Sequence, residues 1–217
     1  MKNLGTVDRV LRIIVAEICL LIGFFWVGME WQILAYLLAV VLTVQAVTGI
    51  CGLYKLMGID TCERVKHKKK GLTNAVLATV VIIALVGGYV SIILTKQAFT
   101  GDFYGLKKPY DTTLQDTGKG LKEQSVSDYG ALHSSLENFT SKYSTYWPLV
   151  VKFDNNFTSD VQKISAAVEG SNTDISSGDL TAAHEKLGMA EPIFQDMINR
   201  YRLDGRWLKS KSYINLP

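Results

Sequence analysis

The chain has 217 residues and a net charge of +3 at pH 7. Residues 1–100 hold 10 basic and 5 acidic side chains, whereas residues 101–217 hold 13 basic and 15 acidic ones. Phosphate binding needs a concentrated basic face, so this mildly acidic second half argues against nucleic acid as a partner. All three cysteines lie in the first half, which excludes a disulfide framework and thiol chemistry from the second.

Three apolar runs reach the roughly 20 residues that a membrane-spanning helix needs. They cover Ile13–Met29, Trp31–Cys51 and Leu72–Leu94. Only Glu30 joins the first two, which predicts a tight hairpin. A cleaved signal peptide is not expected, because the first run is long and leads straight into the next.

Basic residues in the flanks predict the orientation of these spans. They precede the first run and fill the segment between the second and third runs, whereas the hairpin tip has none. We therefore expect a multi-pass protein with the amino terminus in the cytoplasm and everything after the third span outside. The cluster Lys66, Lys68, Lys69 and Lys70 acts as the topological signal, and it could also attract anionic lipid headgroups at roughly 1 kcal/mol per basic residue.

Cys51 and Cys62 border this cytoplasmic loop, where thiols are normally reduced and a disulfide is not expected. Two interpretations stay open. The cysteines are structural or incidental, or they form a redox pair, a persulfide carrier or half of a metal site shared between two chains. Nearby Arg64 and the lysines favour thiol reactivity, but the spacing matches no zinc-ligand pattern.

Two motifs flank the predicted hairpin. They are GTVDRVLRI (Gly5–Ile13) and CGLYKLMGIDTC (Cys51–Cys62). Together they resemble the YgaP-like transmembrane domain, a small bacterial and archaeal family whose members start with Gly-x-x-Asp-Arg and finish with Cys-Pro-Leu-Tyr and Gly-Ile-x-Thr-Cys. The resemblance covers about residues 3–66, and Gly52 stands where the family usually has proline.

The resemblance implies a membrane anchor in a bacterial or archaeal inner membrane. In some family members this anchor is fused to a cytoplasmic rhodanese that handles sulfane sulfur. Only a few residues precede the first motif here, so we expect the membrane module without the sulfurtransferase activity.

Polar and small residues within the spans suggest helix packing. Glu17 could pair with Arg12 or reach for the membrane interface, and Gln45 should bond a neighbouring helix. In the third run, Ala84 with Gly88 and Gly87 with Ser91 form two small-residue pairs four positions apart, a spacing that lets helices approach closely. These pairs predict a partner-facing surface, although glycine is common in membrane helices in any case.

The exported half is predicted to begin with a linker. Residues 96–127 contain several glycines and Pro109 among polar residues, which indicates at most a short helix. Aromatic residues in and beside this segment suggest that part of it packs on the bilayer or on a partner. They are Phe99, Phe103, Tyr104 and Tyr110.

Residues 128–217 show helical periodicity. Apolar residues recur every three or four positions from Tyr129 to Tyr146, again from Val150 to Val168, and from Leu180 to Tyr201. Residues 169–179 are predicted as a loop, Asp179 as a helix cap, and Pro192 as a bend. Such amphipathic helices predict an antiparallel bundle of three or four, so the whole fold is expected to be all-α.

This bundle loosely resembles the cytochrome c prime and b562 type, especially at SGDLTAAHEKL (Ser177–Leu187). No Cys-x-x-Cys-His is present, which excludes covalent haem. A metal or non-covalent haem could use His133, Glu137, His184 and Glu191 if the helices bring them together. The alternative is that both histidines are boundary residues. Sequons at Asn138 and Asn156 matter only in a host that glycosylates exported proteins.

No catalytic constellation stands out, so we expect a non-enzymatic accessory or scaffold subunit of a larger membrane complex, without a cofactor. Its expected partners are membrane lipids, other integral subunits and an extracytoplasmic protein. Two alternatives remain: a thiol or sulfur-handling protein centred on Cys51 and Cys62, and an external module that binds a metal, haem or small ligand.

Overall fold

The computed structural model describes residues 3–59, 61 and 70–203. The elements in these ranges are helices, without a strand, which confirms the all-α prediction. The chain divides into two compact units, Met1–Leu94 and Thr95–Pro217. The bundle unit therefore begins far earlier than residue 128, where the sequence placed it.

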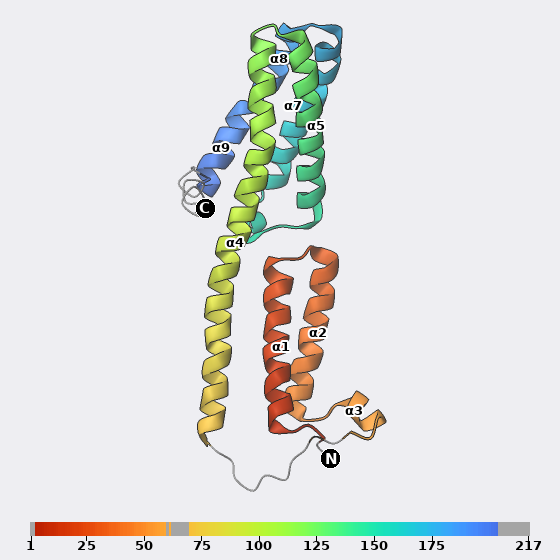
Figure 1. Ribbon diagram of the computed structural model, residues 1–217, viewed down its shortest axis with the longest axis vertical. Coiled ribbons are helices and arrows are strands. Elements are labelled where there is room, and N and C mark those ends of the chain that lie inside the picture. The colour runs from red at the N-terminus through yellow and green to blue at the C-terminus, as the bar shows by residue number, and fades with distance from the viewer. Residues whose placement is uncertain (1–2, 60, 62–69, 204–217) are drawn as a thin grey trace, which may run out of the picture. The chain divides into compact units, whose positions relative to one another are not determined.

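The first unit is built on a helical hairpin, visible at the α1 and α2 labels in Figure 1. The helices pack closely where Gly23 faces Tyr36: a Cβ atom on Gly23 would lie only 2.8 Å from the tyrosine ring. Gln32 donates its side-chain N–H to the Gly23 carbonyl at 3.0 Å and fixes the same contact. The elements of this unit are α1 (Thr6–Phe25), α2 (Met29–Thr48), α3 (Gly52–Leu56) and the first part of α4 (Lys70–Gly118).

Two of the described helices are long and apolar enough to cross a membrane. They are α2 and the part of α4 from Ala75 onward. Helix α1 carries Asp8, Arg9 and Arg12 in its first two turns and Glu17 near its middle. The predicted count of three spans therefore remains a prediction.

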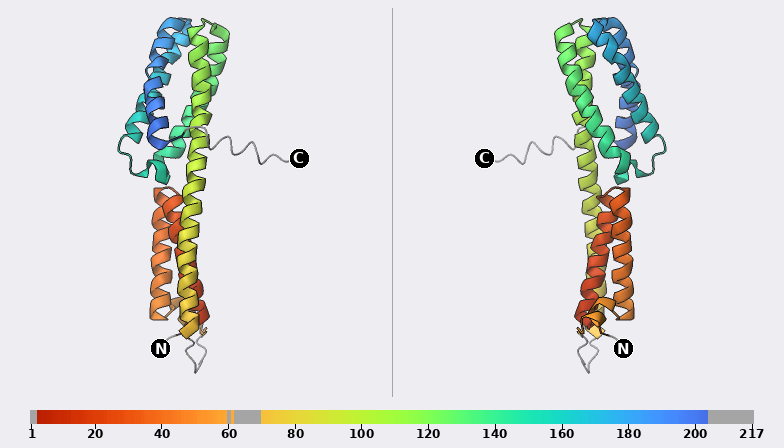
Figure 2. Two further views of the ribbon diagram at one scale, coloured as in Figure 1. Left: turned by 90° about the vertical axis from the view of Figure 1, so that its left-hand side faces the viewer. Right: turned by 90° about the vertical axis from the view of Figure 1, so that its right-hand side faces the viewer.

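The second unit is a bundle of helices that lie side by side in both views of Figure 2. Helix α5 packs on α7, and α7 packs on α8. Besides the last part of α4, the unit contains α5 (Lys122–Thr145), α6 (Leu149–Lys152), α7 (Phe157–Ser177), α8 (Leu180–Gly188) and α9 (Glu191–Tyr201).

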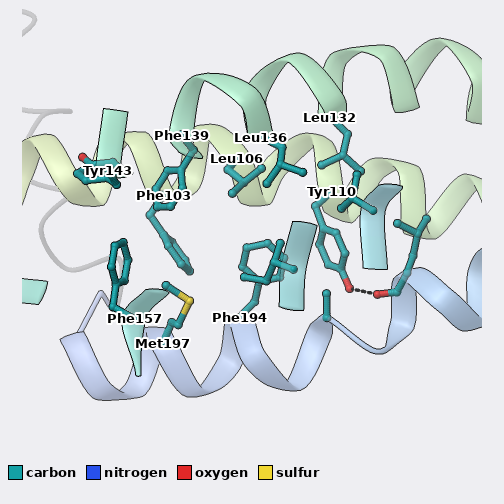
Figure 3. Close-up of a cluster of buried hydrophobic side chains, with 14 of the residues drawn as sticks. Phe103, Leu106, Tyr110, Leu132, Leu136, Phe139, Tyr143, Phe157, Phe194 and Met197 are labelled. Atoms are coloured by element: carbon teal, nitrogen blue, oxygen red, sulfur yellow. Dashed lines mark hydrogen bonds between the residues drawn. The ribbon is translucent and has the colours of Figure 1, made fainter. Parts of the chain in front are cut away.

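Aromatic side chains dominate the core of this bundle. Figure 3 shows Phe103, Leu136 and Phe194 converging from α4, α5 and α9. The Tyr110 hydroxyl donates to the Leu187 carbonyl at 2.8 Å, so the one polar atom of a fully buried ring is satisfied. Burial of each such ring stabilises the fold by roughly 1.5–3 kcal/mol.

The predicted linker of residues 96–127 is wrong, because α4 continues to Gly118 and α5 starts at Lys122. Four apolar residues at helical spacing form a buried stripe on α4. They are Phe99, Phe103, Leu106 and Tyr110. This stripe outweighs the cost of the exposed glycines, about 1 kcal/mol each, and of Pro109, which removes one backbone hydrogen bond. The aromatic residues of this segment thus pack in or against the bundle core. The prediction that they pack on the bilayer or on a partner is wrong.

The predicted loop of residues 169–179 is also helical, since α7 runs to Ser177. Its polar residues suggested a loop, but Ser171 is buried and donates its hydroxyl to the Val168 carbonyl at 2.7 Å. Ile175 is buried one turn later. A hydroxyl that bonds the backbone of its own helix can replace an apolar residue in the core.

The third predicted helix is present, in two pieces. Asp179 caps α8 by accepting from the Ala182 N–H at 3.1 Å, as predicted. The break falls at Met189 and Ala190, and Pro192 then occupies the first turn of α9, where its missing N–H costs nothing. The predicted bend is therefore a break between two helices.

Candidate functional site

The amino-terminal segment before α1 lies against the residues that follow α2. The backbone N–H groups of Asn3 and Leu4 both donate to the Gly49 carbonyl, at 3.1 and 3.2 Å. The Asn3 side chain donates to the Cys51 carbonyl at 2.9 Å and accepts from the Cys51 N–H at 2.8 Å. One asparagine amide thus hydrogen-bonds both the backbone N–H and the backbone carbonyl of Cys51.

Thr61 joins the same segment from a third part of the chain. Its backbone N–H donates to the Asn3 carbonyl at 3.1 Å, and its hydroxyl accepts from the Gly5 N–H at 3.1 Å. A Cβ atom on Gly5 would stand 2.3 Å from the Thr61 carbonyl oxygen, so this contact requires glycine. The Gly5 and Thr61 positions of the two motifs therefore contact each other directly.

The acidic and basic residues of the first motif extend this contact. Arg12 pairs with Asp8 at 3.1 Å and donates to the Gln45 side chain of α2 at 2.6 Å. Its guanidinium also lies over the Tyr54 ring, 5.1 Å from the centroid. Asp8 accepts from Thr61 at 3.3 Å, so these side chains link both helices of the hairpin to the segment after them.

Gly49 ends α2 in the left-handed conformation, with φ of +73°. The Arg9 guanidinium occupies the space that a side chain would need there, only 1.6 Å from an ideal Cβ position. Arg9 also donates to the Leu4 carbonyl at 3.2 Å. The positive φ and this close approach both require glycine at 49. We call the whole cluster the motif junction: Asn3, Leu4, Gly5, Asp8, Arg9, Arg12, Gln45, Gly49, Cys51, Tyr54 and Thr61.

Of the predicted thiol site, the structure describes Cys51, a free cysteine that is 2% exposed. A reagent in water cannot reach so buried a sulfur without a local opening of the junction. Cys62, Lys66, Lys68 and Lys69 lie outside the described residues, as does the side chain of Lys70. The predicted pairing of Glu17 with Arg12 is wrong, because Arg12 instead bonds Asp8 and Gln45.

The small residues of α4 contact α1 of the same chain. An ideal Cβ on Gly87 would come within 2.8 Å of the Leu21 side chain, and the Trp26 indole donates to the Ser91 hydroxyl at 3.1 Å. The backbone of Ala84 lies beside Glu17, although the residue itself is exposed. Gly88, in contrast, has no atom within 4 Å of its ideal Cβ among the described residues. Gly87 and Ser91 thus face α1, whereas Ala84 is exposed and a Cβ atom on Gly88 would meet open space.

The four predicted metal ligands do not come together. His133 lies 3.9 Å from Glu137 as an exposed pair on α5. The Nδ1 atom of His184 lies 2.9 Å from the Leu114 carbonyl, and Glu191 binds Lys107. Throughout the described ranges, no three histidine, cysteine, aspartate or glutamate side chains form a group that could hold a metal ion.

Sequence reasoning missed Lys107, a lysine buried on the apolar stripe of α4. Its ammonium binds Asp111 at 2.6 Å and Glu191 at 3.0 Å, and it lies over the Phe194 ring. An open groove of about 730 Å³ runs beside it. The ammonium has three N–H donors, and its acceptors are one oxygen of Asp111 and both oxygens of Glu191. It therefore stabilises the packing of α4 on α9 and has no donor left to attract a ligand. Its position beside Leu106 in the stripe was the only signal in the sequence.

Comparison with known proteins agrees with the geometry of the first unit. Residues 1–65 match the model of a family described as inner membrane protein YgaP-like, transmembrane domain. This match confirms the resemblance read from the two motifs, and it places the protein in a membrane. No curated protein and no solved structure matches the chain.

Proposed function

We propose that this chain is a non-catalytic, integral accessory or scaffold subunit of a larger membrane complex. One observation carries the proposal: the polar groups of both motifs bond one another in the motif junction, and the Cys51 thiol is buried there. Motif residues that satisfy each other support a rigid anchor more than a reaction site.

The proposed anchor places the amino terminus in the cytoplasm and the bundle outside. The basic residues Lys2, Arg9 and Arg12 before the first apolar run, and those between α2 and α4, support this orientation, because short cytoplasmic segments are enriched in lysine and arginine. The bundle would then dock an extracytoplasmic protein partner.

The outward face of α4 around Gly88 is the proposed contact with another integral subunit. Leu85 and Tyr89 on either side of it are 68% and 67% exposed. A glycine between large apolar side chains lets a second helix approach its backbone closely.

Extraction of the native membrane in a mild detergent, followed by native-gel separation and mass spectrometry, tests the proposal. We expect stable co-migration with other membrane subunits, and the Gly88→Leu variant should lose it. Migration alone, as a monomer or homodimer, would contradict an accessory role.

A second function is favoured by one contact of the junction. Asn3 binds both Cys51 and Thr61, and Cys62 follows Thr61 directly in the sequence. If the two cysteines handle thiols or sulfur, substitution of both by serine (Cys51→Ser with Cys62→Ser) should abolish that thiol or sulfur chemistry. In an accessory subunit, this double variant should assemble into the complex unchanged.

A further inference from the structure

The segment that connects α5 to α7 exposes two aromatic side chains. Phe153 is 78% exposed and Trp147 is 44% exposed, although both carry large apolar rings. We call residues 146–156 the aromatic loop. Phe153 belongs to the apolar periodicity from Val150 to Val168, which predicted that it is buried, and for this residue the prediction is wrong.

The aromatic loop is held in place by its other residues. Val151 is 1% exposed and belongs to the core, and Asp154 is bound by Arg200 of α9 at 2.7 Å. The Trp147 indole donates to the Tyr143 carbonyl at 2.9 Å, so the ring has a fixed position. Phe153 therefore projects from a supported backbone.

The loop lies at the end of the bundle where α4 enters. Phe99, one turn after the first residue of the bundle unit, contacts Tyr143 and Phe157 with ring centroids 5.2 and 6.0 Å apart. These two residues bracket the aromatic loop in the chain. Among the bundle residues that the structure describes, three other exposed large apolar residues lie elsewhere: Leu121 and Val126 near the α4–α5 turn, and Met189 between α8 and α9.

The apolar part of α4 ends at Leu94, directly before the bundle unit, and the helix continues without a break. At 1.5 Å per residue, Phe99 lies about 8 Å along the helix from Leu94. The headgroup region of a bilayer extends about 5–8 Å beyond the hydrocarbon core on each side. Phe99, which contacts both residues that bracket the loop, is thus at headgroup depth when the apolar segment of α4 spans the core.

We propose that the aromatic loop is a membrane-surface anchor, with Trp147 and Phe153 inserted among the lipid headgroups of the adjacent leaflet. Tryptophan and other aromatic rings favour this zone because it accepts both apolar and polar atoms. The anchor does not depend on the accessory role proposed above. It gives the bundle a second attachment to the bilayer besides α4.

Site-specific photocrosslinking in the full chain tests this anchor. Phe153 is replaced by the photoreactive analogue benzoylphenylalanine, and the protein is reconstituted in vesicles of phosphatidylcholine and phosphatidylglycerol. Met189, which is 69% exposed, is replaced in the same way as the matched control. Both positions are exposed, so neither substitution should disturb the fold, and near-ultraviolet circular dichroism verifies this.

After irradiation, mass spectrometry of the labelled peptides identifies what each position touched. We expect lipid adducts at position 153 and no lipid adducts at position 189. Equal lipid adducts at both positions, or none at 153, would overturn the proposal. The same variant is also irradiated in native membranes. Predominant adducts at 153 with another protein there would also overturn the proposal, because the loop would then be a protein-docking surface.

Discussion

The two units of this chain are held together by different interactions. In the first unit, polar side chains join distant backbone segments at the motif junction, and glycines let helices approach closely. In the second, large aromatic rings fill a core, and ion pairs such as Arg200 with Asp154 and Asp160 surround it. Burial of apolar surface drives packing in water. Lipid is itself apolar, so in a membrane hydrogen bonds and close contacts decide more of which helices pack together.

This contrast predicts that the largest effect comes from one ring of the bundle core. Phe99 is fully buried and lies 5.2–6.3 Å from five other rings, so Phe99→Ala leaves a cavity. We expect a loss of about 3–5 kcal/mol in the free energy of unfolding of the bundle. Denaturant titration in detergent, followed by near-ultraviolet circular dichroism, measures it.

Phe153→Ala serves as the control for this change, because that ring is exposed. It should alter the free energy of unfolding by less than about 0.5 kcal/mol. Similar losses in both variants would mean that the aromatic core is not the main support of the bundle.

Two neighbouring glycines of α4 test close packing in the first unit. A side chain at Gly87 meets Leu21, whereas one at Gly88 meets open space. Gly87→Leu should destabilise the packing of α4 on α1 by about 1–3 kcal/mol, since overpacking forces helices apart. Gly88→Leu should leave the isolated chain unchanged.

Thermal unfolding of both variants in one detergent distinguishes the two positions. Equal destabilisation would show that both glycines face α1, and it would remove the proposed outer contact at Gly88.

The motif junction depends on the Asn3 amide, which holds both backbone groups of Cys51. Asn3→Ala leaves those groups without their partner and should cost about 1–3 kcal/mol. The junction should then open more often, so Cys51 should react faster with a maleimide reagent. Mass spectrometry of the peptide that contains Cys51 measures the rate.

Asn3→Asp is the matched variant, since its carboxylate accepts from the Cys51 N–H but cannot donate to the Cys51 carbonyl. We expect an intermediate labelling rate. An unchanged rate in the alanine variant would indicate that other contacts alone keep the thiol buried.

The smallest expected effect concerns acid stability of the bundle. Burial alone raises the pKa of Asp154, but hydrogen bonds from Tyr201, Arg200 and the Asn156 N–H outweigh burial and lower it. A carboxylate with a lowered pKa stabilises the folded state at neutral pH. This contribution should be lost as pH falls below about 4, the pKa of an unperturbed aspartate.

Asp154→Asn should remove this part of the pH dependence, which unfolding at pH 3 and pH 7 would reveal. An identical difference between the two pH values in the variant and the natural chain would exclude Asp154 as its source.

Much of the fold was readable from apolar spacing alone. The stripe from Tyr129 to Tyr143 is buried on α5 as expected, and Asp179 caps α8. The failures at residues 96–127 and 169–179 share a cause: glycines, exposed polar residues and buried hydroxyls such as Ser171 hid the stripe that the helix buries. Local composition signals a loop, but tertiary packing decides.

The candidate site was only partly predictable. The two motifs marked where it lies, but the role of Asn3 was invisible, because its partners are 48 and 58 positions away in the chain. The small-residue pairs on α4 predicted a close helix contact, but the sequence did not show that α1 is the helix they contact. Spacing on one helix shows that a close approach is possible, and it does not identify the helix that approaches.

The separation between Asn3 and Thr61 also sets an order of events during synthesis. At roughly 5–20 residues per second, a ribosome needs about 3–12 s to add the residues between them. Both helices of the hairpin are complete before Thr61 exists, so the amino-terminal segment can bond Gly49 and Cys51 early, but its bonds to Thr61 form only after both helices have been made. A pulse of maleimide during synchronised translation should therefore label Cys51 in short nascent chains and fail to label it in finished ones.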